Sequence, residues 1–483
     1  MKLKVNKIGN KLCLYFSINY CRDILLDKSD IIEVHIKSND KDIKFITKFN
    51  YNITIRNSIV KSLDLRVSDI VDVKIKRITS IQRAKDLFKN NKIDLLSLIP
   101  AKTSRNYDII VDKFNKNSEK WLRIWYCHNR GSGRQIELKR FLDVEMFGSL
   151  LGQYQAEGTK NKNDKYAKWC LQFTNKLIDE HKEYLNYLSE LGVNKENLEF
   201  TFKYNPKNIQ KDKAYFYIDE FNNAINLPLK ITLNNNMKGR GFVNTYCNVL
   251  LTEIILNSMN KIRKLLAYKR KYNILERKLV NSFFSKLLTG DGTLDIRVKN
   301  RQYNFPYTRI IIVDQDLEYL RDYKLIMNNL GFKAKINEKH ISVRAGVSFD
   351  KLVHLYKIKA FRNTNNWNKL ISVIEIYLKG RRLNTNYGFV DLKKYNSFTS
   401  MDIVNDYNVG GMGALDWLHN KEKEGFVERL KTTKSPINWI LTDKALRFTD
   451  FVANWQNDLN KLKKERNIYN PDELLESLKT KFR

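Results

Sequence analysis

One pattern of segments occurs twice in this chain of 483 residues, and this repetition constrains the fold more than any other feature. The first copy is an apolar segment that ends at Glu157-Gly158, followed by a strand pattern, an amphipathic helix pattern and Leu191-Gly192-Val193. The second copy runs in the same order from Asp291-Gly292 to Leu330-Gly331-Phe332. The exits at Gly192 and Gly331 are 331 − 192 = 139 residues apart. The repeat predicts two halves of the same topology.

The two apolar segments have the composition of buried helices that end at a glycine. Small residues such as Gly152 and Gly290 lie within them, and small side chains let two helix backbones approach closely. Helices packed side by side in this way place Glu157 next to Asp291. Two adjacent carboxylates repel each other unless a divalent cation lies between them. The sequence therefore predicts a metal site that the two halves share.

The two segments resemble the motifs of the LAGLIDADG homing endonucleases. Residues 150–158 read Leu-Leu-Gly-Gln-Tyr-Gln-Ala-Glu-Gly, and residues 287–292 read Leu-Leu-Thr-Gly-Asp-Gly. The resemblance extends over about residues 119–380. It implies an α+β fold with a pseudo-twofold αββαββα core, whose antiparallel sheets form a saddle over duplex DNA. Lys286 stands where the family has a small residue, which predicts either looser helix packing there or a lysine at the rim.

The resemblance also implies a function, that of a site-specific double-stranded DNA endonuclease. Glu157 and Asp291 would then be the ligands of a divalent metal and the catalytic carboxylates. Carboxylate, water and phosphate oxygens suit Mg²⁺ or Mn²⁺, and no histidine or thiolate lies near them in the sequence to favour zinc. The family often adds one basic catalytic residue per half. By position the candidates are Lys269 and Lys271 in the first half and Lys359 and Arg362 in the second.

The saddle sheets would present alternating residues to the DNA. The expected strands are 159–174, 198–204, 214–218 and 241–248 in the first half, and 294–301, 307–313, 333–337 and 340–344 in the second. Gln172 and Asn244 are candidates for reading base edges, and the basic residues for contacting phosphates. The full set of expected DNA contacts is Lys160, Lys162, Lys165, Lys168, Gln172, Lys203, Asn244, Arg297, Lys299, Arg301, Arg309 and Arg344.

The net charge supports a polyanionic partner. The chain has 87 basic and 53 acidic residues, so its net charge is 87 − 53 = +34. A lysine-biased genome accounts for part of this excess, but the magnitude favours nucleic acid as the partner. No apolar run approaches a transmembrane span and the N-terminus has no signal-peptide pattern, so we expect no membrane association. The internal repeat indicates a monomer with pseudo-twofold symmetry.

Five cysteines occur, and none forms a CxxC motif. This count and spacing argue against a zinc ribbon and against a disulfide scaffold. The cysteines have apolar or aromatic neighbours. We therefore expect buried thiols in a reducing, cytoplasmic compartment.

The regions that flank the core read as accessory domains. Residues 1–78 contain a second repeat, whose Ser-Asp-Ile turns are offset by 68 − 29 = 39 residues, and they resemble the AbrB-type swapped-hairpin DNA-binding module. Residues 79–118 read as a connector with a short helix near 81–88. The first half of the core, residues 119–272, opens with a hairpin over 121–139. The second half, residues 273–380, follows it.

Residues 386–483 read as a winged helix-turn-helix module with a charged tail. One helix runs to Tyr407 and a second over 414–424. Strands over 425–430 and 439–442 flank a polar tip, and a charged helix is expected over 461–483. A helical hairpin that contacts another protein is the alternative interpretation of this region.

Two other functions fit the same sequence. One is a non-cleaving transcription regulator that combines a LAGLIDADG core with a helix-turn-helix, and the other is an RNA maturase that assists intron splicing. The presence of both acids favours the nuclease, because a protein that only binds has no need of two charges that repel phosphate. The chain does not begin with Cys or Ser or end in His-Asn. We therefore expect a free-standing or intron-encoded enzyme and not an intein.

Overall fold

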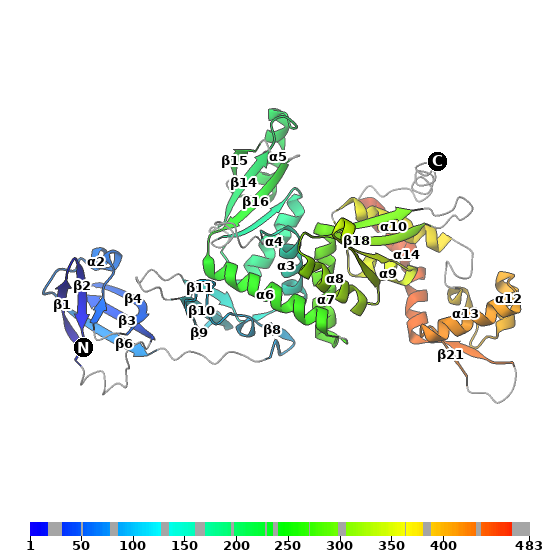
Figure 1. The fold of residues 1–483 in the computed structure, drawn as a ribbon, viewed down its shortest axis with the longest axis horizontal. Coiled ribbons are helices and arrows are strands. Elements are labelled where there is room, and N and C mark those ends of the chain that lie inside the picture. Colours follow the sequence, from blue (N-terminus) through cyan, green and yellow to red (C-terminus); the bar gives the residue numbers. More distant parts are fainter. Residues whose placement is uncertain are drawn as a thin grey trace. The chain divides into compact units, whose positions relative to one another are not determined.

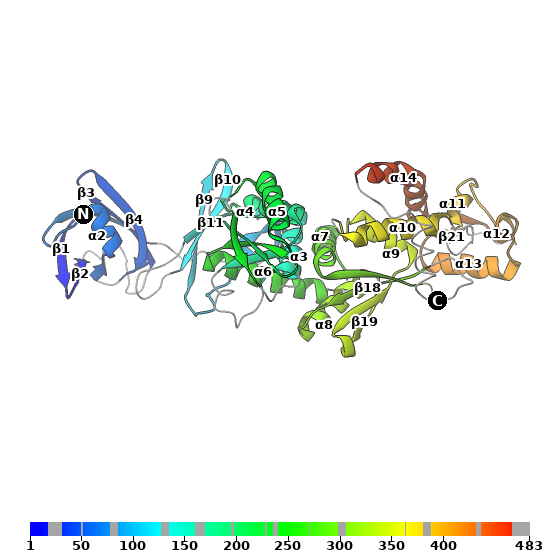
Figure 2. The ribbon, with the colours of Figure 1, turned by 90° about the horizontal axis from the view of Figure 1, so that it is seen from above.

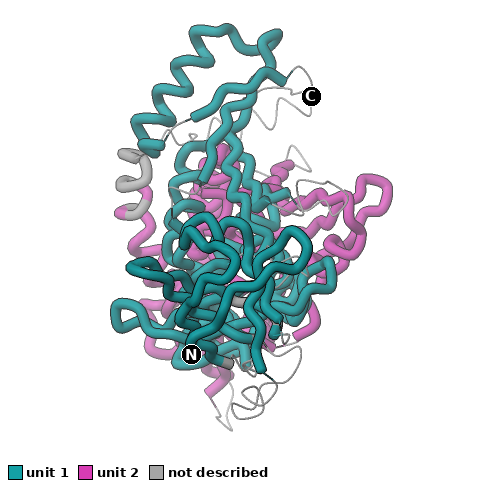
Figure 3. Tube along the Cα trace, turned by 90° about the vertical axis from the view of Figure 1, so that its left-hand side faces the viewer, with its two compact units in different colours: residues 1–265, 272–279 teal, residues 266–271, 280–483 magenta. Residues whose placement is uncertain are grey.

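The computed structural model divides into two compact units (Figure 3). One unit comprises residues 1–265 and 272–279, the other residues 266–271 and 280–483, and each is described by itself. None of the helices in the described residues combines the length and the apolarity that a membrane span needs. The structure describes residues 1–17, 31–49, 52–77, 86–126, 135–159, 170–194, 198–227, 229–234, 240–269, 271–297, 306–362, 364–379, 388–430 and 436–465.

The N-terminal domain is a six-stranded sheet with the strand order β4-β3-β6-β1-β2-β5 (Figure 1). Its elements are β1 (Lys2–Ile8), β2 (Lys11–Tyr15), β3 (Ile31–Ser38), β4 (Lys41–Lys48), β5 (Asn52–Thr54), α2 (Asn57–Leu63) and β6 (Ile70–Arg77). The 39-residue repeat is visible in the pairing, because His35 of β3 lies opposite Lys74 of β6 and 74 − 35 = 39. Antiparallel pairing of equivalent residues is what a local twofold relation between two repeats requires. Residues 18–30, where the repeat predicts the first copy of the short helix, lie outside the described residues.

Two small sheets follow the N-terminal domain in the sequence. Their elements are β7 (Phe88–Lys89), β8 (Lys92–Asp94), the 3-10 turn η1 (Leu95–Ser97), β9 (Ile109–Lys116), β10 (Glu119–Tyr126), β11 (Gln135–Lys139) and β12 (Phe141–Leu142). The orders are β11-β10-β9 and β12-β8-β7. The hairpin expected over 121–139 is therefore part of a three-stranded sheet, and the predicted boundary at residue 119 falls between the paired strands β9 and β10. Of the helix expected near 81–88, residues 81–85 lie outside the described residues and Phe88 begins β7.

The first half of the core has one helix more than the expected αββαββα order. Its elements are α3 (Val144–Glu157), β13 (Leu171–Asn175), α4 (Ile178–Leu191), β14 (Glu199–Tyr204), α5 (Lys211–Ile225), β15 (Leu229–Leu233), β16 (Arg240–Tyr246) and α6 (Val249–Tyr268). The sheet order is β13-β16-β14-β15, and β15 pairs with β14 in parallel after the crossover helix α5. Figure 1 shows α5 beside this sheet, where Phe221 stacks on Phe242 at 4.4 Å between ring centroids.

The strand expected over 214–218 is wrong, because these residues lie within α5. The run Ala-Tyr-Phe-Tyr-Ile has the aromatic composition of a strand. However, the buried residues are Ala214, Ile218 and Phe221, whose spacing of four and three residues is that of a helix face.

The second half has the expected αββαββα order, followed by one further helix, and its sheet is antiparallel (Figure 2). Its elements are α7 (Ile274–Asp291), β17 (Gly292–Arg297), β18 (Tyr307–Val313), α8 (Leu317–Asn329), β19 (Lys333–Asn337), the 3-10 turn η3 (Glu338–His340), β20 (Ser342–Gly346), α9 (Phe349–Lys357) and α10 (Asn365–Lys379). The strand order is β17-β18-β20-β19, and helices α8 and α10 contact this sheet. The mixed helix and strand fold with antiparallel sheets is thereby confirmed. The counterparts of β18, β20 and β19 in the first half are β13, β16 and β14, so α5 and β15 form an insertion.

The C-terminal region contains the expected order of helices and strands. Its elements are α11 (Phe389–Leu392), α12 (Ser400–Tyr407), α13 (Gly411–Lys423), β21 (Val427–Arg429), β22 (Trp439–Leu441) and α14 (Asp443–Glu465). Thr399 and Asp402 form a capping box at the start of α12, which explains why the helix begins there. The sequence did not indicate α14, which packs on α9 through aromatic rings. Of the tail helix expected over 461–483, the structure describes residues 461–465, at the end of α14.

A buried histidine lies at the centre of the first half. His181 of α4 is enclosed by the rings of Phe173, Phe200, Phe221 and Phe242, with centroid separations of 5.1 to 6.4 Å. A ring nitrogen donates to the carbonyl of Asn175 at 3.1 Å. Burial lowers the pKa of His181 to about 4, because the site cannot solvate the imidazolium.

We expect this histidine to make stability depend on pH. The folded-state pKa lies below the unfolded value of about 6.5, so the loss of stability begins as the pH falls through 6.5 and is complete below 4. The loss amounts to about 3 kcal/mol, measured by urea unfolding at several pH values. His181→Phe should flatten the dependence, whereas His340→Gln in the exposed turn η3 should not. Equal slopes for wild type and His181→Phe between pH 6.5 and 4 would contradict the assignment.

Candidate functional site

Glu157 is the last residue of α3, a helix whose C-terminal part is buried on all sides. The side chain of Asp143 caps the helix by accepting from the amide of Met146 at 2.8 Å, and residues 150–155 are all buried. A Cβ at Gly158 would lie 2.5 Å from Tyr154, so only glycine lets the chain leave the helix here. The Tyr154 hydroxyl donates to the carbonyl of Thr159 at 3.0 Å. The carboxylate of Glu157 thus lies half-buried at a fixed helix end.

A buried polar layer supports α3. The Gln153 amide donates to the carboxylate of Glu180 at 2.7 Å and to its backbone carbonyl at 2.9 Å. Arg263 of α6, which is only 1% exposed, donates to the side-chain oxygens of Gln155 at 3.5 Å and Asn260 at 3.1 Å. Sequence reasoning missed this layer. The signal was the pair of glutamines inside an otherwise apolar helix, since buried amides need partners.

Asp291 repeats the local arrangement of Glu157 at the end of α7. Residues 283–289 are buried all round the helix, as expected of a central helix. A Cβ at Gly292 would lie 2.5 Å from the carbonyl oxygen of Leu288, so this exit also requires glycine. Gly292 then begins β17 opposite Ile312. Lys286 is 9% exposed, so the expectation that it lies at the rim is wrong.

The two acids lie in different compact units, Glu157 in the first and Asp291 in the second. The coordination of one cation by both carboxylates therefore stays a prediction. Each one is a half-buried oxygen donor at a helix end, which suits a hard divalent cation. Among the described residues no group of three or more His, Cys, Asp and Glu side chains forms a closed protein cage. A donor set of one or two carboxylates fits Mg²⁺, which retains waters and takes phosphate oxygens from a substrate.

The second sheet has one face that does not pack on its helices, and several predicted DNA contacts lie on it. On β18, Thr308, Ile310 and Ile312 are buried, so Arg309 faces the other way. Asp295 of β17 lies opposite Arg309 and forms an ion pair with it, so both side chains are on the same face. Arg297 is two residues beyond Asp295 on β17 and therefore lies on this face too. Arg344 lies opposite Ile311 and therefore also belongs to this outward face.

Sequence reasoning missed two basic residues of this outward face. Lys333 and Lys335 alternate with the buried Ala334 on β19, and Lys335 lies opposite Arg344. The period-2 pattern Lys-Ala-Lys was the available signal. Lys299 and Arg301, which were also expected to contact DNA, lie outside the described residues.

In the first sheet only part of the predicted set lies on the outward face. Gln172 lies opposite Thr245, and Lys203 lies opposite Gly241; both are half-buried. Asn244 lies between Phe173 and Phe200 on the helix-packed face and is 1% exposed, so the prediction that it reads a base edge is wrong. The predicted contacts on residues 160–169 fall outside the described residues. These are Lys160, Lys162, Lys165 and Lys168.

The four basic catalytic candidates lie in exposed turns. Lys269 and Lys271 follow α6, and the carbonyl of Lys269 accepts from the side-chain amide of Asn329 at 2.9 Å. Lys359 and Arg362 follow α9, where Lys359 has a φ of +56°. Their catalytic role stays a prediction.

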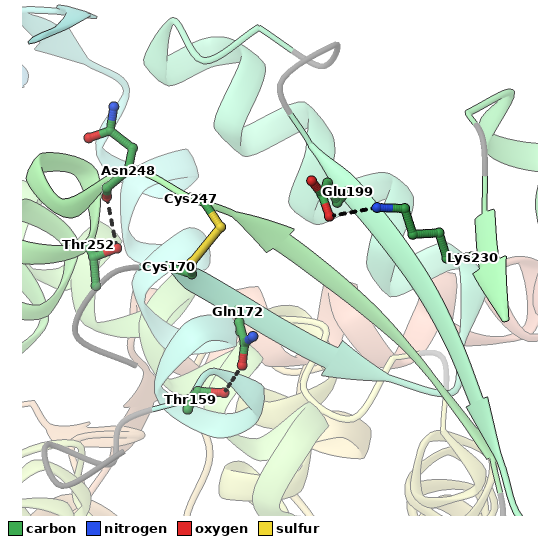
Figure 4. The surroundings of a disulfide bond; sticks show 8 residues. All are labelled: Thr159, Cys170, Gln172, Glu199, Lys230, Cys247, Asn248 and Thr252. Atoms are coloured by element: carbon green, nitrogen blue, oxygen red, sulfur yellow. Dashed lines mark hydrogen bonds and ion pairs between the residues drawn. A yellow bond between two sulfur atoms is a disulfide. The ribbon is translucent and has the colours of Figure 1, made fainter. Parts of the chain in front are cut away.

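A disulfide joins Cys170 and Cys247, which corrects the expectation that these cysteines are thiols (Figure 4). Leu171 lies opposite Tyr246 in the β13–β16 ladder, so the two cysteines are the next pair along it. Cys13 is a buried free thiol, as expected. Cys21 and Cys127 lie outside the described residues. The strand register that brings the pair together is absent from the sequence, which is why spacing did not reveal it.

Removing this cross-link should destabilise the first half. The disulfide spans 77 residues, and a loop of this length corresponds to a stabilisation of about 2 to 4 kcal/mol. We expect this loss in Cys170→Ser/Cys247→Ser, measured by urea unfolding without reductant. Dithiothreitol should produce a similar loss in the wild type and little change in the double variant. An unfolding curve that neither reductant nor substitution shifts would contradict the cross-link.

One protein-family model matches part of the second half. Residues 278–364, which run from α7 to the turn before α10, match the model of the LAGLIDADG-like domain, and the chain therefore contains such a domain. No curated protein matches the chain.

Three solved structures are similar at low identity. I-SmaMI bound to cleaved DNA is 12% identical, with 51% of this chain and 94% of that chain covered and a TM-score of 0.28. I-WcaI bound to its DNA recognition sequence is 12% identical, with 47% and 83% covered and a TM-score of 0.24. I-LtrWI bound to target DNA is 10% identical, with 52% and 96% covered and a TM-score of 0.26. TM-scores in this range do not establish a common fold.

Proposed function

We propose, from the LAGLIDADG-like domain over residues 278–364, that this chain is a site-specific double-stranded DNA endonuclease. The observation that carries the proposal is the matched pair of helix ends. Glu157 and Asp291 are each the last residue of a helix that is buried over its preceding turns, and each precedes a glycine that a larger residue could not replace. A protein that only binds DNA gains nothing from carboxylates at such constrained positions, because they repel phosphate.

We propose that Glu157 and Asp291 together hold Mg²⁺ or Mn²⁺. These carboxylates would hold an ion that, when bound, would lower the pKa of a water molecule and offset charge at the phosphorus and at the leaving 3′ oxygen. The buried layer of Gln153, Gln155 and Arg263 fixes the orientation of α3, and so the position of the Glu157 carboxylate. Lys269 or Lys271, and Lys359 or Arg362, would balance the negative charge that develops on the phosphate.

The outward faces of the two sheets would hold the DNA backbone. Arg309 and Arg344 of the second sheet and Lys203 of the first supply cations on strands, where their positions are fixed. We further propose that residues 1–78, as an AbrB-like module, and residues 386–483, as a winged helix-turn-helix, add DNA contacts on either side. The chain would act as a monomer with internal pseudo-twofold symmetry.

Cleavage of DNA from the genomic neighbourhood of the gene tests the proposal. We expect Mg²⁺-dependent double-strand breaks at one site and no breaks when the ion is chelated. The elements α12, α13, β21 and β22 also suit a transcription regulator. Tight binding of one sequence without magnesium, and without any cleavage, would favour that function. Selective binding of a structured intron RNA would favour a maturase.

A further inference from the structure

A hollow of about 1110 Å³ opens in the second unit where the C-terminal region meets the sheet. Its floor is the outward face of β18, β19 and β20, and its side is the start of α9. Glu424 and Phe426, after α13, and Lys444, at the start of α14, complete the wall. The hollow therefore joins the LAGLIDADG-like domain to elements that lie outside the family match.

Basic side chains dominate the lining. Six basic and two acidic residues line the hollow, a net charge of 6 − 2 = +4. The basic residues are Arg309, Lys333, Lys335, Arg344, Lys351 and Lys444, and the acidic ones Asp350 and Glu424. Among the described residues, Lys333, Lys335 and Arg344 have no carboxylate within ion-pair distance. No acidic residue of the described part of the chain therefore neutralises these three cations.

Lys444 contributes a cation from the C-terminal region. Its ammonium donates to the backbone carbonyl of Glu424 at 2.6 Å and lies 4.0 Å from the centre of the Phe426 ring. Burial lowers the pKa of Lys444, and the nearby cations Lys351 and Lys421 lower it further, whereas Asp350 and Glu424 raise it. An anion in the hollow would favour the charged form of this lysine.

The two walls of the hollow are held together by aromatic packing. Phe448 of α14 contacts Phe349 of α9 at 5.5 Å between centroids, and Trp455 contacts Tyr356 at 5.2 Å. Lys444 precedes these rings by one helical turn or more on the same helix. The position of Lys444 relative to Arg344 is thus fixed by packing within one compact unit.

We propose that this hollow binds the phosphate backbone of duplex DNA, and that Lys351 and Lys444 extend the contact from the sheet to the C-terminal region. The sheet and the C-terminal region then form one continuous DNA-binding surface. A polyanion matches the site because its cations lie on three neighbouring strands, near the start of α9 and on α14. The choice of DNA rests on the proposed function.

The salt dependence of binding tests this surface. Full-length protein is titrated onto a non-specific 40-base-pair duplex at several salt concentrations, and the slope of log K against log salt is compared between variants. Lys351→Gln/Lys444→Gln should reduce the magnitude of the slope by about 1.8, because each lost phosphate contact removes about 0.9. Lys116→Gln/Lys139→Gln is the charge-matched control, since these lysines form ion pairs with Glu137 and Glu119 on the sheet of β9, β10 and β11 and belong to none of the proposed DNA contacts. The control should leave the slope unchanged.

Each outcome separates this proposal from the nuclease assignment. Equal slopes for the hollow variant and the control would overturn the proposal, and so would a change seen only with duplex RNA of the same length. If Lys351→Gln unfolds the protein, Lys444→Gln alone should still lower the slope by about 0.9, and a wild-type slope would overturn it. A lowered slope in a protein that never cleaves DNA would leave the hollow standing and remove the nuclease. DNA cleavage by a protein whose hollow variant has an unaltered slope would support the nuclease and overturn the hollow.

Discussion

Glu157→Gln and Asp291→Asn should each reduce DNA cleavage by at least about 100-fold while leaving DNA binding nearly unchanged. Each substitution keeps the size and the hydrogen-bonding capacity of the side chain but removes the charge that a divalent cation needs. Because the residue stays at its helix end, the buried helix above it is not disturbed. Strand cleavage in Mg²⁺ and binding of a labelled duplex are the two measurements.

Glu145→Gln is a matched control for the first substitution. Glu145 lies at the opposite end of the same helix, where its carboxylate is 61% exposed and lies 3.6 Å from the ammonium of Lys278. An exposed pair of this kind contributes no more than about 1 kcal/mol, so cleavage should stay at the wild-type rate. Wild-type nicking by both Glu157→Gln and Asp291→Asn would remove these residues from the site. Equal losses in Glu145→Gln would indicate a general effect of charge on binding.

Trp455→Ala should destabilise the second unit by about 3 to 5 kcal/mol. The indole is 1% exposed and packs on Tyr356 at 5.2 Å and on Phe451 at 5.5 Å, so its removal leaves a cavity between α14 and α9. Urea unfolding, monitored by circular dichroism, measures the loss. Phe216→Ala is the control, because Phe216 of α5 is 64% exposed and its removal leaves no internal cavity.

This contact makes the C-terminal region part of the second unit and not a separable module. A truncation before residue 386 would uncover Phe349 and Tyr356 of α9, so it should lower stability as well as DNA binding. If the truncated protein unfolds at the same urea concentration as the wild type, α14 does not stabilise α9. The same conclusion follows if Trp455→Ala leaves the free energy of unfolding unchanged.

Local patterns predicted the second half well. Strands β18 and β19 have the predicted bounds, because a short stretch of sequence is enough to show the alternation of apolar and polar residues and the turn residues on either side. The exits at Gly158 and Gly292 were likewise readable, since a helix end is a local event. The order of helices and strands over 400–441 follows for the same reason.

Features that depend on register or on distant packing were not predictable. Asn244 was assigned to the wrong face because a shift of one residue in a strand reverses every side chain. The pairing of Cys170 with Cys247 requires the register of β13 on β16. The packing of Trp455 against Tyr356 of α9 joins segments about a hundred residues apart, and no local sequence pattern predicts such a contact.

The insertion of α5 and β15 makes the two halves unlike each other. The first sheet gains a parallel edge strand that carries Lys230, whereas the second sheet ends at β19. Two identical subunits would have to accept any such change on both sides at once, but a single chain can alter one side alone. A palindromic recognition sequence would offer the same bases to two different surfaces. For the proposed endonuclease, this difference between the halves favours an asymmetric target, in which each half-site diverges independently.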